Sequence, residues 1–143
     1  MSAEVLRGGC LCRAVRYECT HPVSSVALCH CESCRRASGA HVIAWLTVRS
    51  AAFRFTHGAP RELVSSPPVR RTFCANCGSP LTYQHRDSPE SIDVTVATLD
   101  DPNAVVPEFH VWMEDALAWE DRCDTLPRYR TSRTDGLSVK PAK

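Results

Sequence analysis

The sequence has no long hydrophobic run and almost no excess of charge of either sign. No window approaches the length of apolar sequence needed to cross a membrane, and residues 1–9 lack the apolar segment of a secretory signal. The 17 Lys and Arg residues nearly balance the 16 Asp and Glu residues, and the formal net charge of +1 predicts no general attraction to nucleic acid or to a membrane surface. We therefore expect a cytoplasmic protein whose partners include neither a membrane nor nucleic acid.

Aromatic residues are also scarce, at 7% of the chain, whereas proline is frequent, at 10 residues. Such a composition predicts many turns and a modest core, which a structural metal would stabilise. Internal repeats and low-complexity tracts are lacking, and 143 residues fit a single domain. We place this domain at residues 1–126 and interpret the polar residues 127–143 as a frayed tail.

Short segments in which apolar and polar residues alternate recur along the domain, and this period of two predicts half-buried strands. The segments are 13–19, 52–56 and 91–97, with weaker candidates at 61–65, 69–73 and 81–85. Residues 41–48 are apolar on both faces, as in a strand inside a core. Helical sequence is confined to 32–38, which Gly39 ends, and to a short turn at 116–121. The pattern predicts a mainly β fold with one or two short helices.

Cysteine is what the chain has in excess, because seven of its nine cysteines fall into three tight groups. The groups are Cys10 with Cys12, then Cys29, Cys31 and Cys34, and finally Cys74 with Cys77. Disulfides require an oxidising compartment, for which the N-terminal sequence gives no sign. A redox dithiol would explain the last pair but would leave the other two groups without a role. Clustered thiols in a reducing compartment therefore favour metal binding.

The number of clustered cysteines predicts two zinc sites of different kinds. A structural zinc site takes four protein ligands, whereas a catalytic site takes three and keeps one position open. Each outer pair lies beside a glycine turn, at Gly8-Gly9 and at Gly78, where the backbone can curl so that neighbouring thiolates converge. The predicted ligands of the structural zinc are Cys10, Cys12, Cys74 and Cys77.

The middle group, Cys29, Cys31 and Cys34, is predicted to hold the second zinc where a strand passes into a short helix. One local segment can supply three thiolates but hardly a fourth sulfur, so one position would stay open. His30 lies between two of these ligands and either binds the ion or points away from it. A zinc ion with three thiolates activates water poorly and suits a soft sulfur ligand, which predicts a small-molecule thiol as partner.

Four further residues are candidates for other roles. Arg35 and Arg36 are either solvated helix cations or groups that offset the negative site and bind a substrate carboxylate. Cys19 lies on the apolar face of a predicted strand and is expected to fill the core. Cys123 has no predicted role. His110 is a candidate to line the pocket as a proton carrier.

These motifs, in this order, resemble the glutathione-dependent formaldehyde-activating enzyme family, whose domain is shared with centromere protein V. The matching segments are Gly8-Gly-Cys-Leu-Cys12, Cys29-His-Cys-Glu-Ser-Cys-Arg-Arg36, Phe73-Cys-Ala-Asn-Cys-Gly-Ser-Pro-Leu81 and Pro107-x-x-His110-x-Trp112, with Trp119 beyond. The resemblance implies folded-over antiparallel sheets around a structural zinc. It also implies the same division of ligands, with the middle group facing the substrate. Trp119 is expected to pack against the core.

The namesake activity of that family joins glutathione and formaldehyde as S-hydroxymethylglutathione and is a carbon–sulfur lyase reaction. The resemblance therefore implies a zinc lyase acting on an adduct of a small thiol, such as glutathione, with an aldehyde. The alternative is a non-catalytic zinc-binding interaction module, which the centromere relative suggests. The residues specify neither the thiol and the aldehyde nor the number of subunits.

Overall fold

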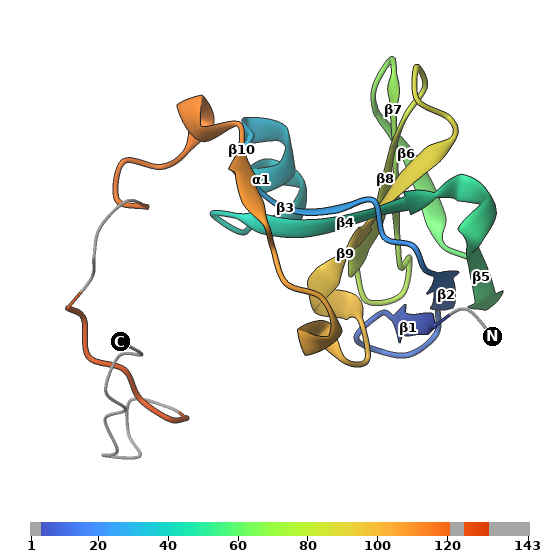
Figure 1. The fold of residues 1–143 in the computed structure, drawn as a ribbon, viewed down its shortest axis with the longest axis horizontal. Coiled ribbons are helices and arrows are strands. Elements are labelled where there is room, and N and C mark those ends of the chain that lie inside the picture. Colours follow the sequence, from blue (N-terminus) through green and yellow to red (C-terminus); the bar gives the residue numbers. More distant parts are fainter. Residues whose placement is uncertain (1–3, 121–124, 132–143) are drawn as a thin grey trace.

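The structure is a computed structural model that describes residues 4–120 and 125–131. This part of the chain forms ten β-strands, one α-helix and four short 3-10 helices (Figure 1). The strands are β1 (Val5–Gly9), β2 (Arg16–Thr20), β3 (Ser25–Cys29), β4 (Ile43–Arg49), β5 (Phe53–His57), β6 (Arg61–Ser66), β7 (Val69–Phe73), β8 (Pro80–His85), β9 (Ser91–Thr95) and β10 (Phe109–Val111). The helices are α1 (Glu32–Ser38), η1 (Ser50–Ala52), η2 (Val96–Thr98), η3 (Pro102–Ala104) and η4 (Met113–Asp115). The mainly β class is confirmed, with a single short α-helix in the described residues.

The strands form a small sheet, in the order β1-β2-β5, and a large sheet, in the order β10-β3-β4-β9-β8-β7-β6. Every pairing is antiparallel except that of the edge strand β10 with β3, which is parallel. The large sheet is therefore mixed, where an antiparallel one was expected. The sequence of β10 gave no sign of this pairing, because three residues are too few to show a period of two.

Strand β1 was also not predicted, because its two glycines have the sequence of a turn. Gly8 pairs with Tyr17 of β2, and a Cβ atom at Gly8 would overlap the Tyr17 hydroxyl and the carbonyl oxygen of Thr98. The glycine is thus required by close packing of the small sheet against η2. The predicted strand 91–97 ends earlier than expected, because Val96–Thr98 turns into η2.

The main core lies between the two sheets and is built from the inward faces of their central strands. Tyr17 of β2 packs there with Leu46, Leu81 and Val94 of the large sheet, all with 1% or less of their surface exposed. Cys19 is fully buried in the same cluster, as predicted. A second, smaller cluster surrounds Trp45, and the middle cysteines belong to it.

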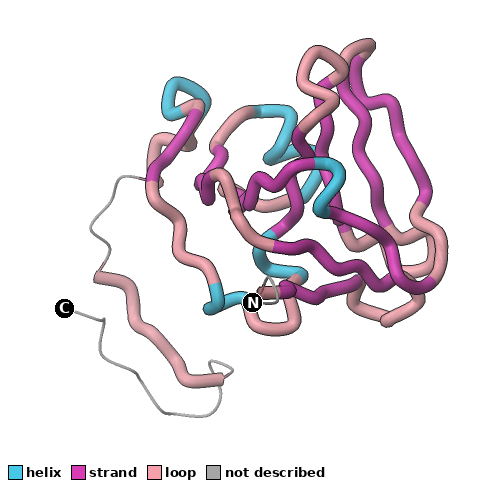
Figure 2. Tube along the Cα trace, turned by 45° about the vertical axis from the view of Figure 1, so that its right-hand side comes forward, coloured by secondary structure: helices cyan, strands magenta, loops and turns pink. Residues whose placement is uncertain are grey.

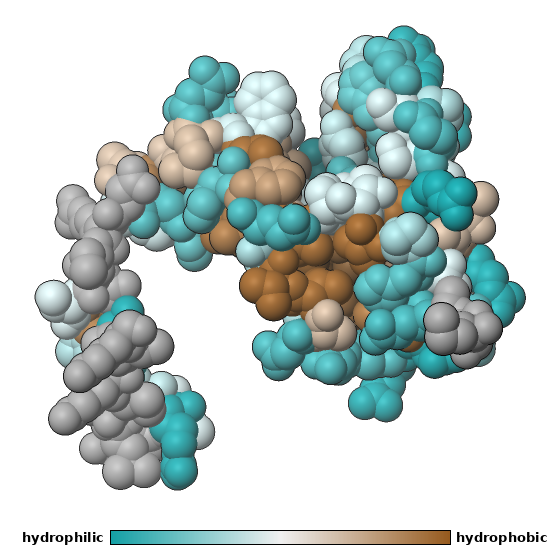
Figure 3. All heavy atoms as spheres, viewed as in Figure 1, coloured by the Kyte–Doolittle hydropathy of each residue, from teal (hydrophilic) through white to brown (hydrophobic). Residues whose placement is uncertain are grey.

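Helix α1 connects β3 to β4 and rises on the same side of β4 as the hairpins of β6, β7 and β8 (Figure 1). Figure 2 shows these hairpin strands as a long arm that extends beyond the rest of the large sheet. In Figure 3, hydrophilic residues cover the tip of this arm, while hydrophobic residues gather below β4. The arrangement leaves a hollow between α1 and the arm, and this hollow is the cavity considered below.

Within the described ranges, no helix combines the length and the apolar character needed to span a bilayer. Of the predicted tail 127–143, residues 132–143 lie outside the part of the chain that the structure describes, as does Cys123.

Candidate metal centres and active site

Two turns far apart in the sequence bring Cys10, Cys12, Cys74 and Cys77 together, and we call these residues the four-cysteine group. The first pair lies between β1 and β2 and the second between β7 and β8, so the group links the small sheet to the large one. The four sulfur atoms lie within 4.8 Å of one another. Cys12 is 3.6 Å from the sulfur of Cys10 and 3.8 Å from that of Cys74. Zinc–sulfur bonds of about 2.3 Å place tetrahedral thiolates about 3.8 Å apart, so this donor set fits zinc.

Hydrogen bonds to the sulfur atoms of Cys12 and Cys77 favour the ionised form of these two thiols. The amide of Asn76 donates to the sulfur of Cys12 at 3.2 Å and lowers the pKa of that thiol. Ser79 lies 3.2 Å from the sulfur of Cys77, and its side chain and backbone lower the pKa of Cys77 to about 5. The N–H of Val15 donates to Cys10 at 3.3 Å. Such contacts around thiolates orient metal ligands and support their charge.

The second group, Cys29, Cys31 and Cys34, is held by one local turn, and we call it the three-cysteine group. Cys29 ends β3, Cys31 caps the N-terminus of α1, and Cys34 lies in the first turns of that helix. The sulfur of Cys31 accepts the backbone N–H of Cys34 at 3.2 Å, which fixes the turn. All three sulfur atoms lie within 4.8 Å of one another, a spacing that also fits three thiolates around one zinc ion.

His30 does not join the three-cysteine group, although two of the group's residues flank it. Its ring is fully buried and points to β10, where Nε2 shares a hydrogen bond of 2.8 Å with Nδ1 of His110. Of the two alternatives for His30, the structure therefore supports the one in which it faces away from the ion. Within the described residues, the group offers three ligands.

The three-cysteine group opens into a cavity of about 980 Å³ between α1 and the arm (Figure 3). The residues that line it around the sulfur atoms include Trp45, Thr47, Arg71, Tyr83, Asp93 and Trp112. This volume lies at the upper end of the range for small-molecule sites. The four-cysteine group does not line this cavity. Only the three-cysteine group therefore opens into this cavity.

Arg71 is a cation in direct contact with the three-cysteine group, and it was not among the site residues predicted from the sequence. Its Nη2 lies 3.7 Å from the sulfur of Cys34, its Nε donates to Ser65 at 3.2 Å, and its guanidinium lies 5.0 Å from the centre of the Tyr83 ring. Only 8% of its surface is exposed. A buried cation beside a thiolate offsets negative charge far more than a solvated one does. The available signal was an arginine on the inward face of the alternating strand 69–73.

The thiols of the three-cysteine group affect one another's pKa, and Arg71 affects the pKa of Cys34. Hydrogen bonds from Cys29 and Cys31, together with Arg71, lower the pKa of Cys34 to about 5. The hydrogen bond to Cys34 and burial raise the pKa of Cys29. In coupled thiols, the apparent pKa values belong to the group and not to one residue. The contact with Arg71 nevertheless favours the ionised form of Cys34.

The two arginines that the sequence pointed to lie farther from the sulfur atoms. Arg36 lines the rim of the cavity, but it is exposed and paired with Glu32 at 2.9 Å. Arg35 donates to the carbonyl of His30 at 3.3 Å and lines a separate hollow beside Gly39. Of the two, only Arg36 faces the cavity.

The structure places the predicted proton carrier and the predicted core tryptophan differently from expectation. His110 does not line the cavity, because its ring turns toward His30 on the other side of β10. Trp119 is 51% exposed and contacts the ring of His41, with centroids 5.1 Å apart, so its expected packing into the core was wrong. Trp112, for which the sequence gave no separate role, lines the cavity instead.

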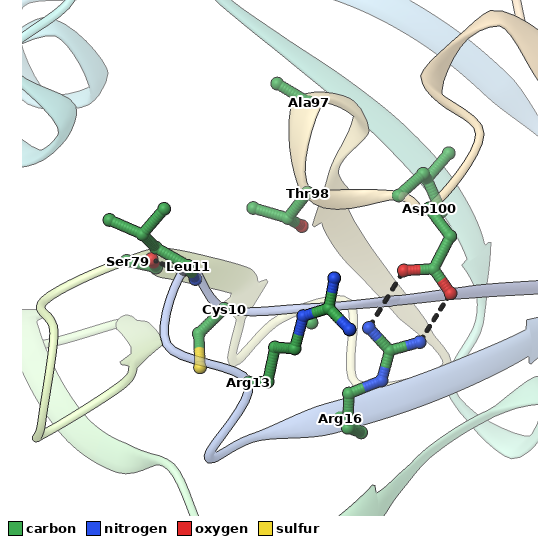
Figure 4. A pocket seen from close by; sticks show the side chains of 10 residues that line it. Cys10, Leu11, Arg13, Arg16, Ser79, Ala97, Thr98 and Asp100 are labelled. Carbon is green, nitrogen blue, oxygen red and sulfur yellow. Dashed lines mark hydrogen bonds and ion pairs between the residues drawn. The ribbon is translucent and has the colours of Figure 1, made fainter.

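A second hollow, of about 830 Å³, lies beside the four-cysteine group and is shown in Figure 4. There the guanidinium of Arg16 faces the carboxylate of Asp100 through two contacts, and Arg13 lies next to this pair. The Arg16 guanidinium lowers the pKa of Asp100. Cys10 also lines this hollow, and its sulfur belongs to the four-cysteine group. The hollow therefore borders a group whose four thiolates would leave a zinc ion no free position.

These features define a β domain with two cysteine sites suited to metal, one of which opens into the cavity beside α1. Residues 5–115 match the model of the family described as glutathione-dependent formaldehyde-activating enzyme, and the chain belongs to this family.

Two curated proteins and a solved structure show similarity to the chain. A protein of Halomonas elongata, provisionally named a glutathione-dependent formaldehyde-activating enzyme, is 27% identical over 135 residues, which cover 83% of this chain and 86% of that protein. An uncharacterized lyase of Schizosaccharomyces pombe is 27% identical over 78 residues, so the match spans 54% of this chain and only 56% of that relative. The crystal structure of a Rhodobacter sphaeroides protein matches with a TM-score of 0.57 and 27% identity, and covers 73% of this chain and 98% of that one.

Proposed function

We propose that the protein is a zinc-dependent carbon–sulfur lyase acting on the adduct of a small thiol with an aldehyde, such as S-hydroxymethylglutathione. The observation that carries this proposal is the opening of the three-cysteine group into the cavity beside Arg71. Three sulfur atoms suit a zinc ion that keeps one position for a ligand, and the cavity gives that ligand room. The names of the relatives support the same class of reaction.

A zinc ion held by the three thiolates would bind the sulfur of the substrate in its anionic form. The chain's own contribution is charge and exclusion of water. Three thiolates and one zinc ion carry a formal charge of −1, which would repel an incoming thiolate, and the buried guanidinium of Arg71 offsets that charge. Trp45 and Tyr83 give the site an apolar wall, which strengthens each of these electrostatic contacts.

The test is the rate at which the protein exchanges free glutathione and formaldehyde with their adduct at equilibrium, measured by NMR exchange spectroscopy. We expect exchange far above the uncatalysed rate with zinc-loaded protein. Cys31→Ser should abolish the acceleration, whereas Cys19→Ala, which changes a buried cysteine outside both groups, should preserve it. Normal exchange by Cys31→Ser would contradict the proposed role of the three-cysteine group.

Direct binding of the thiol is tested with cobalt in place of zinc, by following the thiolate-to-cobalt absorption as glutathione or mercaptoethanol is added. We expect a shift with either thiol. No shift up to millimolar thiol would favour the alternative, a zinc-binding interaction module without catalysis. We further propose a cytoplasmic location, since free thiols persist in a reducing compartment.

A further inference from the structure

A row of polar side chains crosses the large sheet and faces the cavity. Thr47 of β4 lies directly opposite Asp93 of β9, Asp93 lies opposite Tyr83 of β8, and Tyr83 lies opposite Arg71 of β7. Residues directly opposite one another on adjacent strands share one face of a sheet. All four line the cavity that contains the three-cysteine group. The strand register therefore places a hydroxyl, a carboxylate, a phenol and a guanidinium side by side in front of that group.

Asp93 is the only carboxylate in this row, and one of its two oxygen atoms is hydrogen-bonded to its neighbour. Its Oδ1 accepts a hydrogen bond of 2.6 Å from the hydroxyl of Thr47. Among residues 4–120 and 125–131, no donor reaches its Oδ2, and no cation forms an ion pair with it. Burial raises the pKa of Asp93, the bond from Thr47 offsets part of this rise, and the negative charge of Cys34 adds to it. The carboxylate is thus an accessible base of increased strength.

The remaining titratable groups around the cavity are less suited to accept a proton. Tyr83 faces Asp93 from β8, and burial raises the pKa of its phenol, so that it stays protonated. Arg71 faces the row from β7 as a permanent cation. The others that line the cavity are Cys29, Cys31, Cys34, Glu32, Arg36 and Asp115. Glu32 is paired with Arg36, and Asp115 is exposed and accepts the N–H of Glu32, so neither acid belongs to the row that crosses the sheet.

The proposed reaction requires a base. In cleavage of an adduct R–S–CH₂–OH, the carbon–sulfur bond breaks and its electron pair stays on sulfur as the thiolate. The oxygen–hydrogen bond also breaks, and its electron pair forms the second bond of the aldehyde carbonyl. One proton is left over and must be accepted. In the direction of synthesis, the same group must return that proton to the oxygen.

We propose that Asp93 is a catalytic residue that accepts the hydroxyl proton of the adduct during cleavage and donates it back during synthesis. Thr47 is a positioning residue, because its hydroxyl holds Oδ1 of a carboxylate that lines the cavity and leaves Oδ2 for a substrate. This assignment rests on the proposed function. It gives Asp93 the role for which the sequence suggested His110, whose ring does not line the cavity.

The experiment measures glutathione–formaldehyde exchange by the zinc-loaded protein as a function of pH, in the wild type, in Asp93→Asn and in Thr47→Val. Wild-type kcat/KM for cleavage should rise with pH as Asp93 ionises. Asp93→Asn should lower it by about 10²- to 10⁴-fold, the usual effect of losing a general base. In the same variant, kcat/KM should no longer rise with pH, while the zinc content and the cobalt spectrum with glutathione should stay unchanged.

Thr47→Val keeps the carboxylate but removes its hydrogen-bond donor, so the pKa of Asp93 should rise. The rise of kcat/KM should then occur at higher pH. The ¹³C resonance of the Asp93 carboxyl, assigned by triple-resonance NMR of the labelled wild-type protein, gives that pKa independently of turnover. The pKa obtained from kcat/KM and the pKa obtained from the carboxyl resonance should agree in the wild type and in Thr47→Val. This comparison also decides the matter if Asp93→Asn does not fold.

If the carboxyl resonance of Thr47→Val titrates at higher pH while kcat/KM rises at the same pH as in the wild type, the role of Asp93 is overturned. Unchanged exchange by Asp93→Asn would overturn it as well. Wild-type protein that keeps both zinc ions but does not accelerate exchange would overturn the proposed function, and the role of Asp93 with it. The two failures are therefore distinguishable, because only the second appears in the wild type.

Discussion

The four-cysteine group and the three-cysteine group use the same chemistry in opposite surroundings. The first joins two turns 62 residues apart, between Cys12 and Cys74, and links the two sheets. The second is made by one strand end and the helix that follows it, and it faces a cavity. Metal ligands that come from distant segments stabilise the fold that brings them together. Metal ligands from one local segment are not needed to join the sheets, so their site can bind a small molecule. The two groups differ in how their ligands are connected along the chain and in which hollow they border, and they share the same type of ligand.

The largest expected contrast is in stability. Cys12→Ser or Cys77→Ser should prevent folding or lower the melting temperature greatly, because binding of a structural zinc contributes on the order of 10 kcal/mol to folding. Cys31→Ser should leave a folded β domain, since its group closes only a local turn. Circular dichroism and thermal melting check this ranking. The reverse order would show that the two groups had been assigned the wrong way round.

The next contrast is in the release of metal. We expect about two zinc ions per chain, of which a strong chelator removes first the one with an open position. Metal analysis at intervals after adding the chelator should show one fast and one slow step. Cys31→Ser should remove the fast step alone. A single step that survives this substitution would argue against a second ion.

A smaller effect is expected from the cation beside the sulfur atoms. Arg71→Met should weaken binding of glutathione by about 10- to 100-fold, since a charge-assisted contact contributes about 1.5–3 kcal/mol. Arg36→Ala is the matched control, because this arginine is exposed and paired with Glu32. Titration of the cobalt-substituted variants with glutathione measures both effects. Equal losses in the two variants would mean that burial gives Arg71 no special role.

The smallest effect is expected beside the four-cysteine group, at the pair of Arg16 and Asp100. The pKa of Asp100 is lowered in the folded protein, so the pair stabilises the fold above the unfolded-state pKa of about 3.9, and this contribution is lost as the pH falls through the lower folded-state value. Asp100→Asn should cost at most about 1 kcal/mol near neutral pH, because the pair is exposed. Melting curves at pH 7 and pH 3 should differ less in the variant than in the wild type. Glutathione exchange should not change.

The sequence predicted the grouping of the cysteines because metal ligands cluster in short motifs, which can be recognised without knowing the fold. It predicted helix 32–38 and most strands for the same reason, since their periodicity is local. Arg71 and Asp93 belong to strands that were predicted, at 69–73 and 91–97, yet their meeting in one row depends on the pairing of β7, β8 and β9. That register is set by contacts between strands, and no pattern within one strand contains it.

One hairpin carries parts of both cysteine sites. Strand β7 holds Arg71, its connection to β8 holds Cys74 and Cys77, and the register of the two strands shifts between Thr72 and Phe73. A metal ion bound at the turn would therefore also hold the side chains farther along the arm in place. When zinc is scarce, an ion held by the three-cysteine group would be released first, and the fold would remain intact. Release of an ion from the four-cysteine group would then disturb the alignment of the arm.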